Sequence, residues 1–485
     1  MALYFGVLVG IAYFTSKGAD SGSYFLGNKQ SPWYAVAFGM LGDSLSGVTF
    51  ISVPGAVGGA QFSYLQLVLG YMAGYLIISR VLLPLYYRLN LTSIYAYLEG
   101  RYGRNAQKTG AFFFILSRLL GAAGRLYLAA TVIQLFVFDA IGIPFWLSVT
   151  IIIALIFAYT YRGGIKTLVW TDTFQSTILL LAVLCSVVVI ASKMDLSLGG
   201  VVNQIAQSDY SKVFFWDWAP KTFFFKQFIG GAFIAVVMTG LDQNMMQKNL
   251  SCKSLPDAQK NMEWFSVVMA LVNVCFLSLG ALLWIYATQI QLTLPTNALG
   301  KPITDYLFPT LAFNQLGTAA GLLFILGLTA ATFSSADSVL TTLTTSFYHD
   351  FLELHKKTAS EAYKERYRHA IHIGFAVLLL GVILLFKLFN NAAIIDTVLL
   401  IANYTYGPLL GLFFFGILTR RGASDKWIPW IALAAPALCW VVNSHSQAWW
   451  GGYQFGNELL LLNGALTAAM LWMAKAPRRV VNMPQ

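Results

Sequence analysis

The sequence predicts an all-α protein that crosses a lipid bilayer many times. Hydrophobic residues make up 58% of its 485 residues and charged residues only 11%. A soluble chain of this length would carry roughly a quarter charged residues. Apolar segments long enough to cross the bilayer as helices recur along the chain. The expected environment is therefore a membrane, and the composition excludes a set of soluble domains.

The apolar segments predict about thirteen spans of helical length. The first of them lacks a basic n-region and a small-residue cleavage site, so we expect a span there and not a signal peptide. The expected spans are residues 2–14, 33–56, 64–88, 110–136, 144–161, 168–192, 227–247, 263–290, 317–349, 368–388, 392–418, 426–443 and 457–475.

The distribution of Lys and Arg predicts the orientation. With the N-terminus outside, the cytoplasmic loops hold 18 of these residues and the external loops hold 5. Positive residues gather in cytoplasmic loops, so we expect an external N-terminus and a cytoplasmic C-terminus in a bacterial-type inner membrane.

The same accumulation of Lys and Arg in cytoplasmic loops explains the net charge of +11, so this charge does not indicate a nucleic-acid partner and we expect none. The four cysteines form no zinc or disulfide pattern.

The order of spans predicts an internal repeat. A first span and loop (1–32) precede five spans (33–192), a long external loop (193–226) follows, and then come five more spans (227–418) and two C-terminal spans (419–485). Because each half has an odd number of spans, the second half inserts upside down relative to the first. Inverted repeats of this kind are typical of transporters.

The span at 33–56 is interrupted by the polar sequence GMLGDSLSG, residues 39–47. A glycine in a helix interior costs about 1 kcal/mol relative to alanine. A charged residue at mid-bilayer, here Asp43, costs about 2.5–3.5 kcal/mol on insertion scales. One interpretation is close helix packing through small residues. The other is an unwound helix whose free carbonyls bind a cation or a substrate.

A second group of oxygen ligands lies near the end of the span 317–349. Ser334, Ser335 and Ser338 are spaced so that at least two share a helical face. Hydroxyls here and carbonyls at the broken helix are the oxygen ligands that a hard cation such as sodium requires. The alternative is that hydroxyls bond back to their own helix, which we favour for the later threonines 341, 342, 344 and 345.

At these residues the chain resembles the sodium:solute symporter family, whose fold is the LeuT-like inverted repeat. The resemblance covers nearly the whole chain. It rests on GDSLSGVTFISVPG (42–55), RLNLTSIYAYLEGRYG (88–103), YRGGIKTLVWTDTFQ (161–175), GLDQNMMQKNLSCKSLPDAQK (240–260), FSSADS (333–338) and NYTYGPLLGLFFFGIL (403–418). In the fourth segment, Lys248 stands where arginine is usual.

The resemblance implies a sodium site. Its ligands would be the carbonyls of Gly42, Leu45 and Ala331 and the hydroxyls of Ser334 and Ser335. Some members bind a second sodium ion through the aspartate of the WTD segment and a serine pair. Here these positions are Asp172 and the pair Asp337–Ser338, so a carboxylate replaces one hydroxyl. The alternative for Asp172 is a helix N-cap.

Arg125 is the strongest candidate for a residue that binds the substrate. From a span start near residue 110 it lies about 22 Å deep, too deep for comfortable snorkelling. A buried guanidinium is suited to bidentate capture of a carboxylate, whereas Arg118 and Arg80 are expected to be structural. Acidic-sugar transporters of the family look similar here, although a glutamine important in them aligns with Val68. The candidate substrate residues are Ser46, Gly47, Thr49, Gln66, Arg125, Asp242 and Asn244.

Asp242 has two interpretations: contact with a substrate amine, or a cap after Gly240.

From these features we expect a sodium-coupled symporter that imports a small organic anion, a carboxylate or an acidic sugar such as sialic acid. A zwitterionic amino acid and a neutral sugar are the alternative solutes. A membrane sensor module and a channel are the alternative classes. We do not expect the protein to be an enzyme, and we expect it to be a monomer. We expect it to transport two sodium ions with each anion, and Asp172, Asp337 and Ser338 to bind the second sodium ion.

Overall fold

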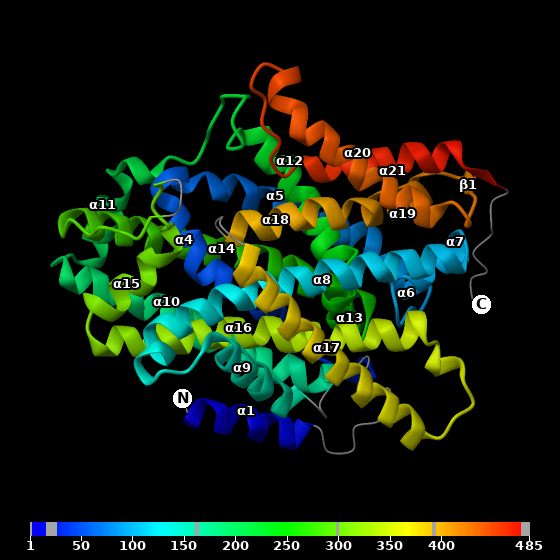
Figure 1. Cartoon of the computed structure of the whole chain (residues 1–485), viewed down its shortest axis with the longest axis horizontal. Coiled ribbons are helices and arrows are strands. Elements are labelled where there is room, and N and C mark those ends of the chain that lie inside the picture. The colour runs from blue at the N-terminus through cyan, green and yellow to red at the C-terminus, as the bar shows by residue number, and fades with distance from the viewer. Residues whose placement is uncertain (1, 16–26, 161–163, 297–299, 390–393, 477–485) are drawn as a thin grey trace.

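Figure 1 shows a computed structural model of the chain, which describes residues 2–15, 27–160, 164–296, 300–389 and 394–476. Most of these residues lie in helices. The described strands are β1 (Gly422–Ala423) and β2 (Lys475–Ala476), which pair antiparallel. The all-α class is therefore confirmed.

The helices of the N-terminal half follow the predicted spans in order. They are α1 (Ala2–Thr15), α3 (Trp33–Ser44), α4 (Gly47–Ala60), α5 (Tyr64–Ile77), α6 (Leu83–Arg88), α7 (Ala96–Arg101), α8 (Arg104–Ile133), α9 (Phe145–Thr160) and α10 (Gly164–Lys193). The long helices α8 and α10 lie along α16 of the other half.

The second half contains a similar set of helices. They are α11 (Leu198–Ala206), α12 (Phe224–Ala235), α13 (Gln243–Leu250), α14 (Leu255–Gln289), α15 (Leu307–Asn314), α16 (Thr318–Ser346), α17 (Glu361–Phe389), α18 (Ile394–Thr405), α19 (Gly407–Leu418), α20 (Ile428–Trp449) and α21 (Leu459–Met473). In the described part of the chain, 7 helices are long and apolar enough to cross a membrane, or up to 9 with each bent pair taken as one span. The count of about thirteen stays a prediction.

Several helices begin before the predicted spans because they continue beyond the apolar segment. The span expected at 263–290 is α14, which begins at Leu255. Ser254 caps it, accepting a hydrogen bond from the backbone N–H of Asp257 at 3.3 Å, and Pro256 occupies the first turn. Hydropathy locates only the part of a helix that faces lipid, so it misses a capped polar first turn.

Breaks interrupt three of the expected spans in the described chain. One separates α18 from α19, which meet at 41° within the span expected at 392–418, and the other two lie at the start of the predicted halves. Of these two, the first separates α3 from α4 at Leu45 and Ser46, as the sequence predicts. The second separates α12 from α13, which meet at 64°, with Asp242 at the N-cap of α13. The span expected at 227–247 is therefore bent, and the expectation of a cap at Asp242 after Gly240, one of the two alternatives for this residue, is confirmed. A π-helical turn at Val236–Gly240 ends the first piece, and the Asp242 carboxylate starts the second.

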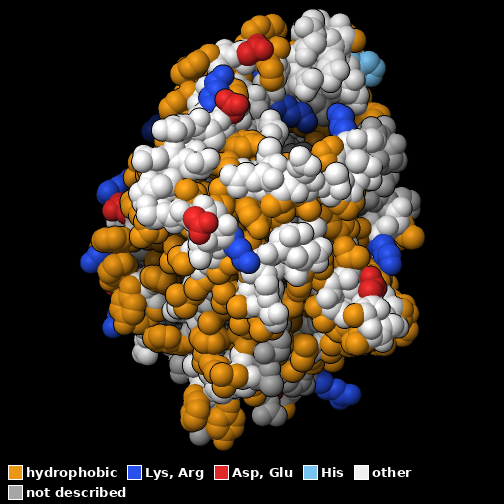
Figure 2. All heavy atoms as spheres, turned by 90° about the vertical axis from the view of Figure 1, so that its left-hand side faces the viewer, with side chains coloured by type: hydrophobic (Ala, Val, Ile, Leu, Met, Phe, Trp, Pro, Cys, Tyr) orange, Lys and Arg blue, Asp and Glu red, His pale blue; other side chains and the backbone are white. Residues whose placement is uncertain are grey.

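Segments expected on the two sides of the membrane lie at opposite ends of the molecule. In Figure 1, α11 and α15, which belong to segments expected outside, lie at the left, and α7 and β1, which belong to segments expected in the cytoplasm, lie at the right. Figure 2 shows the left-hand end, where hydrophobic side chains dominate, charged side chains are scattered and the surface is hollowed in its upper part.

Glycines allow α5 and α12 to pack backbone against backbone. A Cβ atom added at Gly70 would lie within 2.1 Å of the carbonyl oxygen of Phe228, and one at Gly74 within 2.3 Å of that of Ala232. From the other side, a Cβ at Gly231 would lie 2.3 Å from the carbonyl oxygen of Leu67. Small residues that bring helix backbones together are a general means of association in membranes.

We expect Gly70→Ala to lower the thermal unfolding midpoint of the purified protein. The added methyl group meets backbone, which cannot rotate away, and overpacking of this kind costs about 1–3 kcal/mol. Gly121→Ala on α8 is the matched control, because a Cβ there has no atom within 4 Å. An unfolding midpoint of Gly70→Ala equal to that of the control would contradict the close packing.

Candidate functional site

The break between α3 and α4 places backbone oxygens in the core of the molecule. α3 ends at Ser44, and the last carbonyls of a helix have no partner within it. Gly42 lies in this last turn, and Leu45 follows it with non-helical dihedral angles. Both residues are buried. These are two of the three residues whose carbonyls were expected to bind sodium.

The hydroxyls of α16 face this break. A Cβ at Gly42 would lie only 2.4 Å from Ser334 Oγ and 2.7 Å from Ser176 Oγ, so α3, α10 and α16 meet at Gly42. Ser334 Oγ donates to Asp172 Oδ1 at 2.7 Å. Ala331, the third expected carbonyl ligand, is buried one turn earlier on α16. The structure therefore brings Gly42 and Ser334 close together, and carbonyl and hydroxyl oxygens are ligands that suit a hard cation. A sodium site formed by all five expected ligands stays a prediction.

Ser176 was not among the sequence candidates. It lies one helical turn after Asp172 on α10 and donates to the carbonyl oxygen of Phe38 at 2.9 Å. Its i, i+4 spacing from Asp172 was the available signal, because that spacing places both side chains on the same helix face. Ser176 brings another hydroxyl to the surroundings of Gly42.

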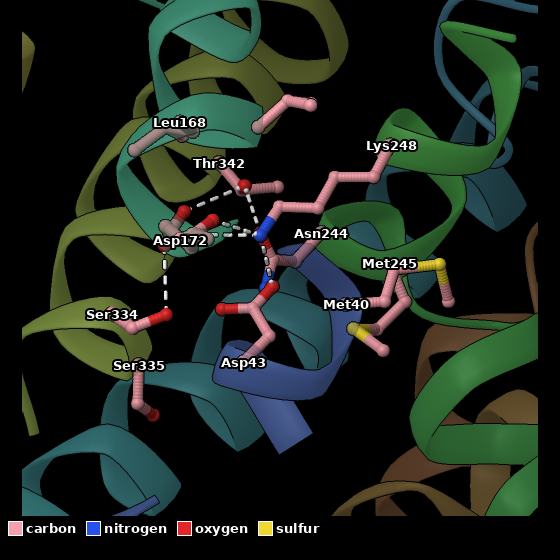
Figure 3. Close-up of polar contacts among 12 residues, drawn as sticks. Met40, Asp43, Leu168, Asp172, Asn244, Met245, Lys248, Ser334, Ser335 and Thr342 are labelled. Atoms are coloured by element: carbon pink, nitrogen blue, oxygen red, sulfur yellow. Dashed lines mark hydrogen bonds and ion pairs between the residues drawn. The ribbon is translucent and has the colours of Figure 1, made fainter. Parts of the chain in front are cut away.

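Ser335 differs from Ser334 in the direction of its side chain. Figure 3 shows Ser334 reaching toward Asp172, whereas the Ser335 side chain points away from it. Arg125 Nη1 donates to Ser335 Oγ at 3.4 Å. Ser335, an expected sodium ligand, is therefore in contact with Arg125, an expected substrate residue.

Lys248 lies in the middle of a buried cluster of charges. Its Nζ is 2.5 Å from Asp172 Oδ2, 2.8 Å from Asp43 Oδ2 and 3.0 Å from Ser338 Oγ. Figure 3 shows the ammonium between the two carboxylates. Asn244 Nδ2 donates to the same oxygen of Asp43 at 2.7 Å. Sequence reasoning noted Lys248 only as a departure from arginine and missed this role.

Asp337 lies apart from this ion pair. Its Oδ2 accepts a hydrogen bond from the hydroxyl of Tyr159 on α9 at 2.8 Å, and its Oδ1 is buried without a hydrogen-bond partner among the described residues. Ser338, the next residue, instead contacts Lys248 and Asp172. Of the three residues expected to bind a second sodium ion, Asp337 therefore points toward Tyr159. Asp172 and Ser338 instead contact the ammonium of Lys248.

A cavity of about 110 Å³ lies beside the break in α3 and α4. Of the expected substrate residues, Ser46, Thr49 and Arg125 line it. Its other walls include tyrosines of α5, methionines of α12–α14 and apolar residues of α18. These lining residues include Tyr64, Tyr71, Tyr75, Met238, Met245, Met269, Val398 and Leu399.

Four expected substrate residues lie outside this lining. Gln66 is buried and bonds to backbone before α12, donating to the carbonyl oxygen of Thr222 at 2.9 Å. Gly47 packs against α16, where a Cβ would lie 2.9 Å from Thr332 Oγ1. Asn244 bonds to Asp43, and Asp242 is part of an ion pair. A role for these four in solute contact stays a prediction.

Asp242 is held by Arg118 and Tyr406. Arg118 Nε and Nη2 donate to its two oxygens at 2.5 and 2.6 Å, and the hydroxyl of Tyr406 donates to Oδ2 at 2.7 Å. Oδ1 also accepts from the backbone N–H of Met245 at 3.2 Å, which caps α13. The carboxylate therefore connects α8, α13 and the junction of α18 and α19.

We expect Asp242→Asn to lower the thermal unfolding midpoint strongly. Removing one partner of a buried ion pair leaves an uncompensated charge and costs about 3–5 kcal/mol. Glu263→Gln is the matched control, because its pair with Arg80 is solvent-exposed and such pairs contribute about 0–1 kcal/mol. An unchanged midpoint of Asp242→Asn would show that the Arg118 contact does not stabilise the fold.

Arg125 has no carboxylate partner among the described residues, in contrast to Arg118. It lines the cavity about two helical turns beyond Arg118 on α8, and its Nη1 donates to the hydroxyl of Ser335. An arginine in a membrane interior is costly unless its charge is compensated. The guanidinium is thus positioned for an anionic group that enters the cavity.

Comparison with known proteins decides the family. A model of the sodium:solute symporter family matches residues 24–425. The chain belongs to this family. It is 26% identical over 480 residues to the sodium/sialic acid symporter NanT of Aliivibrio fischeri, covering 96% of this chain and 92% of that one. It is 27% identical over 426 residues to sodium-coupled monocarboxylate transporter 1 of Mus musculus, covering 86% and 67%.

Solved structures confirm the LeuT-like fold of this symporter. A substrate-bound, outward-open Na⁺-coupled sialic acid symporter superposes with a TM-score of 0.83 at 21% identity, covering 98% of this chain and 97% of that one. Mhp1, a nucleobase-cation-symport-1 family transporter, superposes with a TM-score of 0.59 at 15% identity, covering 94% and 95%. Sodium is the coupling ion of this family of multi-pass membrane proteins.

Proposed function

We propose that this symporter carries a small organic anion whose negative group is bound by Arg125. The observation that carries the proposal is an arginine that lines a cavity without a carboxylate partner in the described chain. Guanidinium groups bind carboxylates through two parallel hydrogen bonds, and this bond is strong where water is excluded. A solute carboxylate would supply the charge that the protein does not.

The proposed sodium site consists of the carbonyls of Gly42, Leu45 and Ala331 and the hydroxyls of Ser334 and Ser335. It is supported by the close approach of α3 to α16 at Gly42. Because Ser335 also contacts Arg125, a sodium ion that fixes the Ser335 hydroxyl would fix the guanidinium for the solute. This contact gives a direct path for coupling, since each ligand would order a residue that the other needs.

The class of anion follows from what the named relatives share. NanT is a symporter of sialic acid, and the mouse relative transports monocarboxylates. The common chemical feature of these solutes is a carboxylate. A zwitterionic amino acid would also need a partner for its amine, and Asp43, which lines the cavity, already accepts from Lys248 and Asn244. A neutral sugar would leave Arg125 without a counter-charge.

The remaining features of the proposal concern placement in the cell. We expect an inner-membrane protein with an external N-terminus and a cytoplasmic C-terminus, because Lys and Arg concentrate in the loops on one side. We also expect it to act as a monomer and to catalyse no covalent reaction. A sensor module and a channel are the alternative classes. Accumulation of a solute against its gradient would exclude both of them, since neither can drive such accumulation.

Thermal stabilisation tests the solute class. The purified protein is heated with sialic acid, short-chain monocarboxylates, amino acids or neutral sugars, each in sodium chloride and in potassium chloride. A ligand that binds only the folded state raises the unfolding midpoint. We expect stabilisation by a carboxylate-bearing solute, larger in sodium than in potassium. Stabilisation by neutral sugars alone would contradict the proposed role of Arg125.

A further inference from the structure

We propose that the ε-ammonium of Lys248 acts as a built-in cation where a second sodium ion was expected, so that the chain binds a single sodium ion. Lys248 lies on α13 and is fully buried. Its Nζ contacts Asp172 and Ser338, two of the three residues expected at the second ion. The inference goes beyond the proposed function and rests on the sodium site proposed there.

The ammonium has as many donors as it has oxygen partners. A lysine ammonium carries three N–H donors and no acceptor. Here they meet three oxygens from three helices: Asp43 Oδ2 of α3 at 2.8 Å, Asp172 Oδ2 of α10 at 2.5 Å and Ser338 Oγ of α16 at 3.0 Å. Carboxylate and hydroxyl oxygens around a positive charge are also what sodium requires. The ammonium thus takes the ligands that a second ion would use.

The position of Lys248 is fixed by the helix that carries it. Asn244 lies one turn earlier on the same face of α13. It donates to Asp43 Oδ2 at 2.7 Å and accepts from Thr342 Oγ1 of α16 at 2.8 Å. α13 is therefore held to both α3 and α16 next to the ammonium. A sodium ion could replace the ammonium only if this buried side chain moved away.

The two oxygens of Asp172 have separate tasks in this arrangement. Oδ1 accepts from Ser334, a proposed sodium ligand, and Oδ2 contacts the Lys248 ammonium. Asp337 is directed toward Tyr159 on α9 and is not among the three oxygen partners of the ammonium described above. A second sodium ion near Asp172 would stand beside both the first ion and Lys248. Like charges repel strongly at such distances in a medium of low dielectric constant.

The sodium count determines whether the membrane potential can drive transport. One sodium ion with one monoanion moves no net charge. A second sodium ion would add one net positive charge, worth about 2.3 kcal/mol per 100 mV. That free energy corresponds to about a fifty-fold difference in accumulation. With Lys248 in place of the second ion, accumulation of a monoanion depends on the sodium gradient alone.

Binding of radioactive ²²Na⁺ to the purified protein tests the inference without any organic solute. We expect wild type to bind one sodium ion per chain at saturation, with a Hill coefficient of one. Lys248→Met removes the ammonium and leaves its oxygens, so we expect this variant to bind two sodium ions per chain at saturation. Lys253→Met, at an exposed lysine of the following loop, is the control and should bind one ion.

Two results would overturn the inference. The first is two sodium ions per wild-type chain, which decides the matter even if Lys248→Met does not fold. The second is a folded Lys248→Met protein that binds a single ion, because the ammonium would then not be what excludes the second. Neither result depends on which solute is carried, so a failure here is distinguishable from a failure of the organic-anion proposal.

Discussion

Arg125→Lys is expected to reduce the initial rate of anion uptake at least tenfold while the protein still folds. Lysine keeps the positive charge but loses the planar pair of donors that binds both oxygens of a carboxylate. A hydrogen bond to a charged group contributes about 1.5–3 kcal/mol. Its loss corresponds to roughly a ten- to hundredfold change in affinity. The measurement is sodium-driven uptake of the best-stabilising carboxylate into proteoliposomes.

Arg80→Lys is the matched control for this substitution. Arg80 is exposed and pairs with Glu263 at 2.7 Å, and neither residue lines the cavity. Its replacement by lysine keeps the charge at a site where geometry matters little. Wild-type uptake by Arg125→Lys, or by Arg125→Gln, would show that no carboxylate is bound there, and a neutral solute would become the better account.

Replacing Ser334 and Ser335 together with alanine is expected to raise the sodium concentration for half-maximal uptake at least tenfold. The substitution removes both hydroxyls from the proposed set of sodium ligands and leaves the carbonyls of Gly42, Leu45 and Ala331. It also frees Asp172 Oδ1 from its hydrogen bond with Ser334. The measurement is initial uptake as a function of external sodium at a fixed membrane potential.

Ser186→Ala is the control for the loss of a buried hydroxyl. Ser186 Oγ bonds back to the carbonyl oxygen of Ala182 on its own helix at 2.7 Å. The single variant Ser334→Ala separates the sodium effect from the contact between Ser335 and Arg125, because Ser334 does not touch the guanidinium in the described contacts. Wild-type sodium dependence in the double variant would remove both serines from the site.

The sequence predicted those features that depend on local composition. Apolar length located the membrane helices, and the Gly- and Ser-rich segment 39–47 located the break between α3 and α4. At the second break, the sequence offered the cap at Asp242 as one of two alternatives but did not predict the bend between α12 and α13. Its cause is a π-helical turn followed by a side-chain cap, and neither changes mean hydropathy.

The partners of buried charges could not be predicted, because they join segments far apart in the chain. Asp172 was expected to bind a second sodium ion, but Lys248, 76 residues later, lies against it. Arg118 was expected to be structural, and its partner proved to be Asp242, 124 residues away. Gln66 was placed near the solute from its span alone, and it bonds to the backbone at Thr222. Each assignment needed the relative positions of the helices.

Sodium-driven accumulation of a carboxylate is the measurement that tests the central claim most directly. Proteoliposomes are loaded with potassium chloride, diluted into sodium chloride or potassium chloride, and supplied with labelled sialic acid or a labelled short-chain monocarboxylate. The account predicts transient accumulation above the external concentration in sodium only, abolished when a sodium ionophore dissipates the gradient. Equal uptake in potassium, or accumulation of neutral solutes but of no carboxylate, would contradict it.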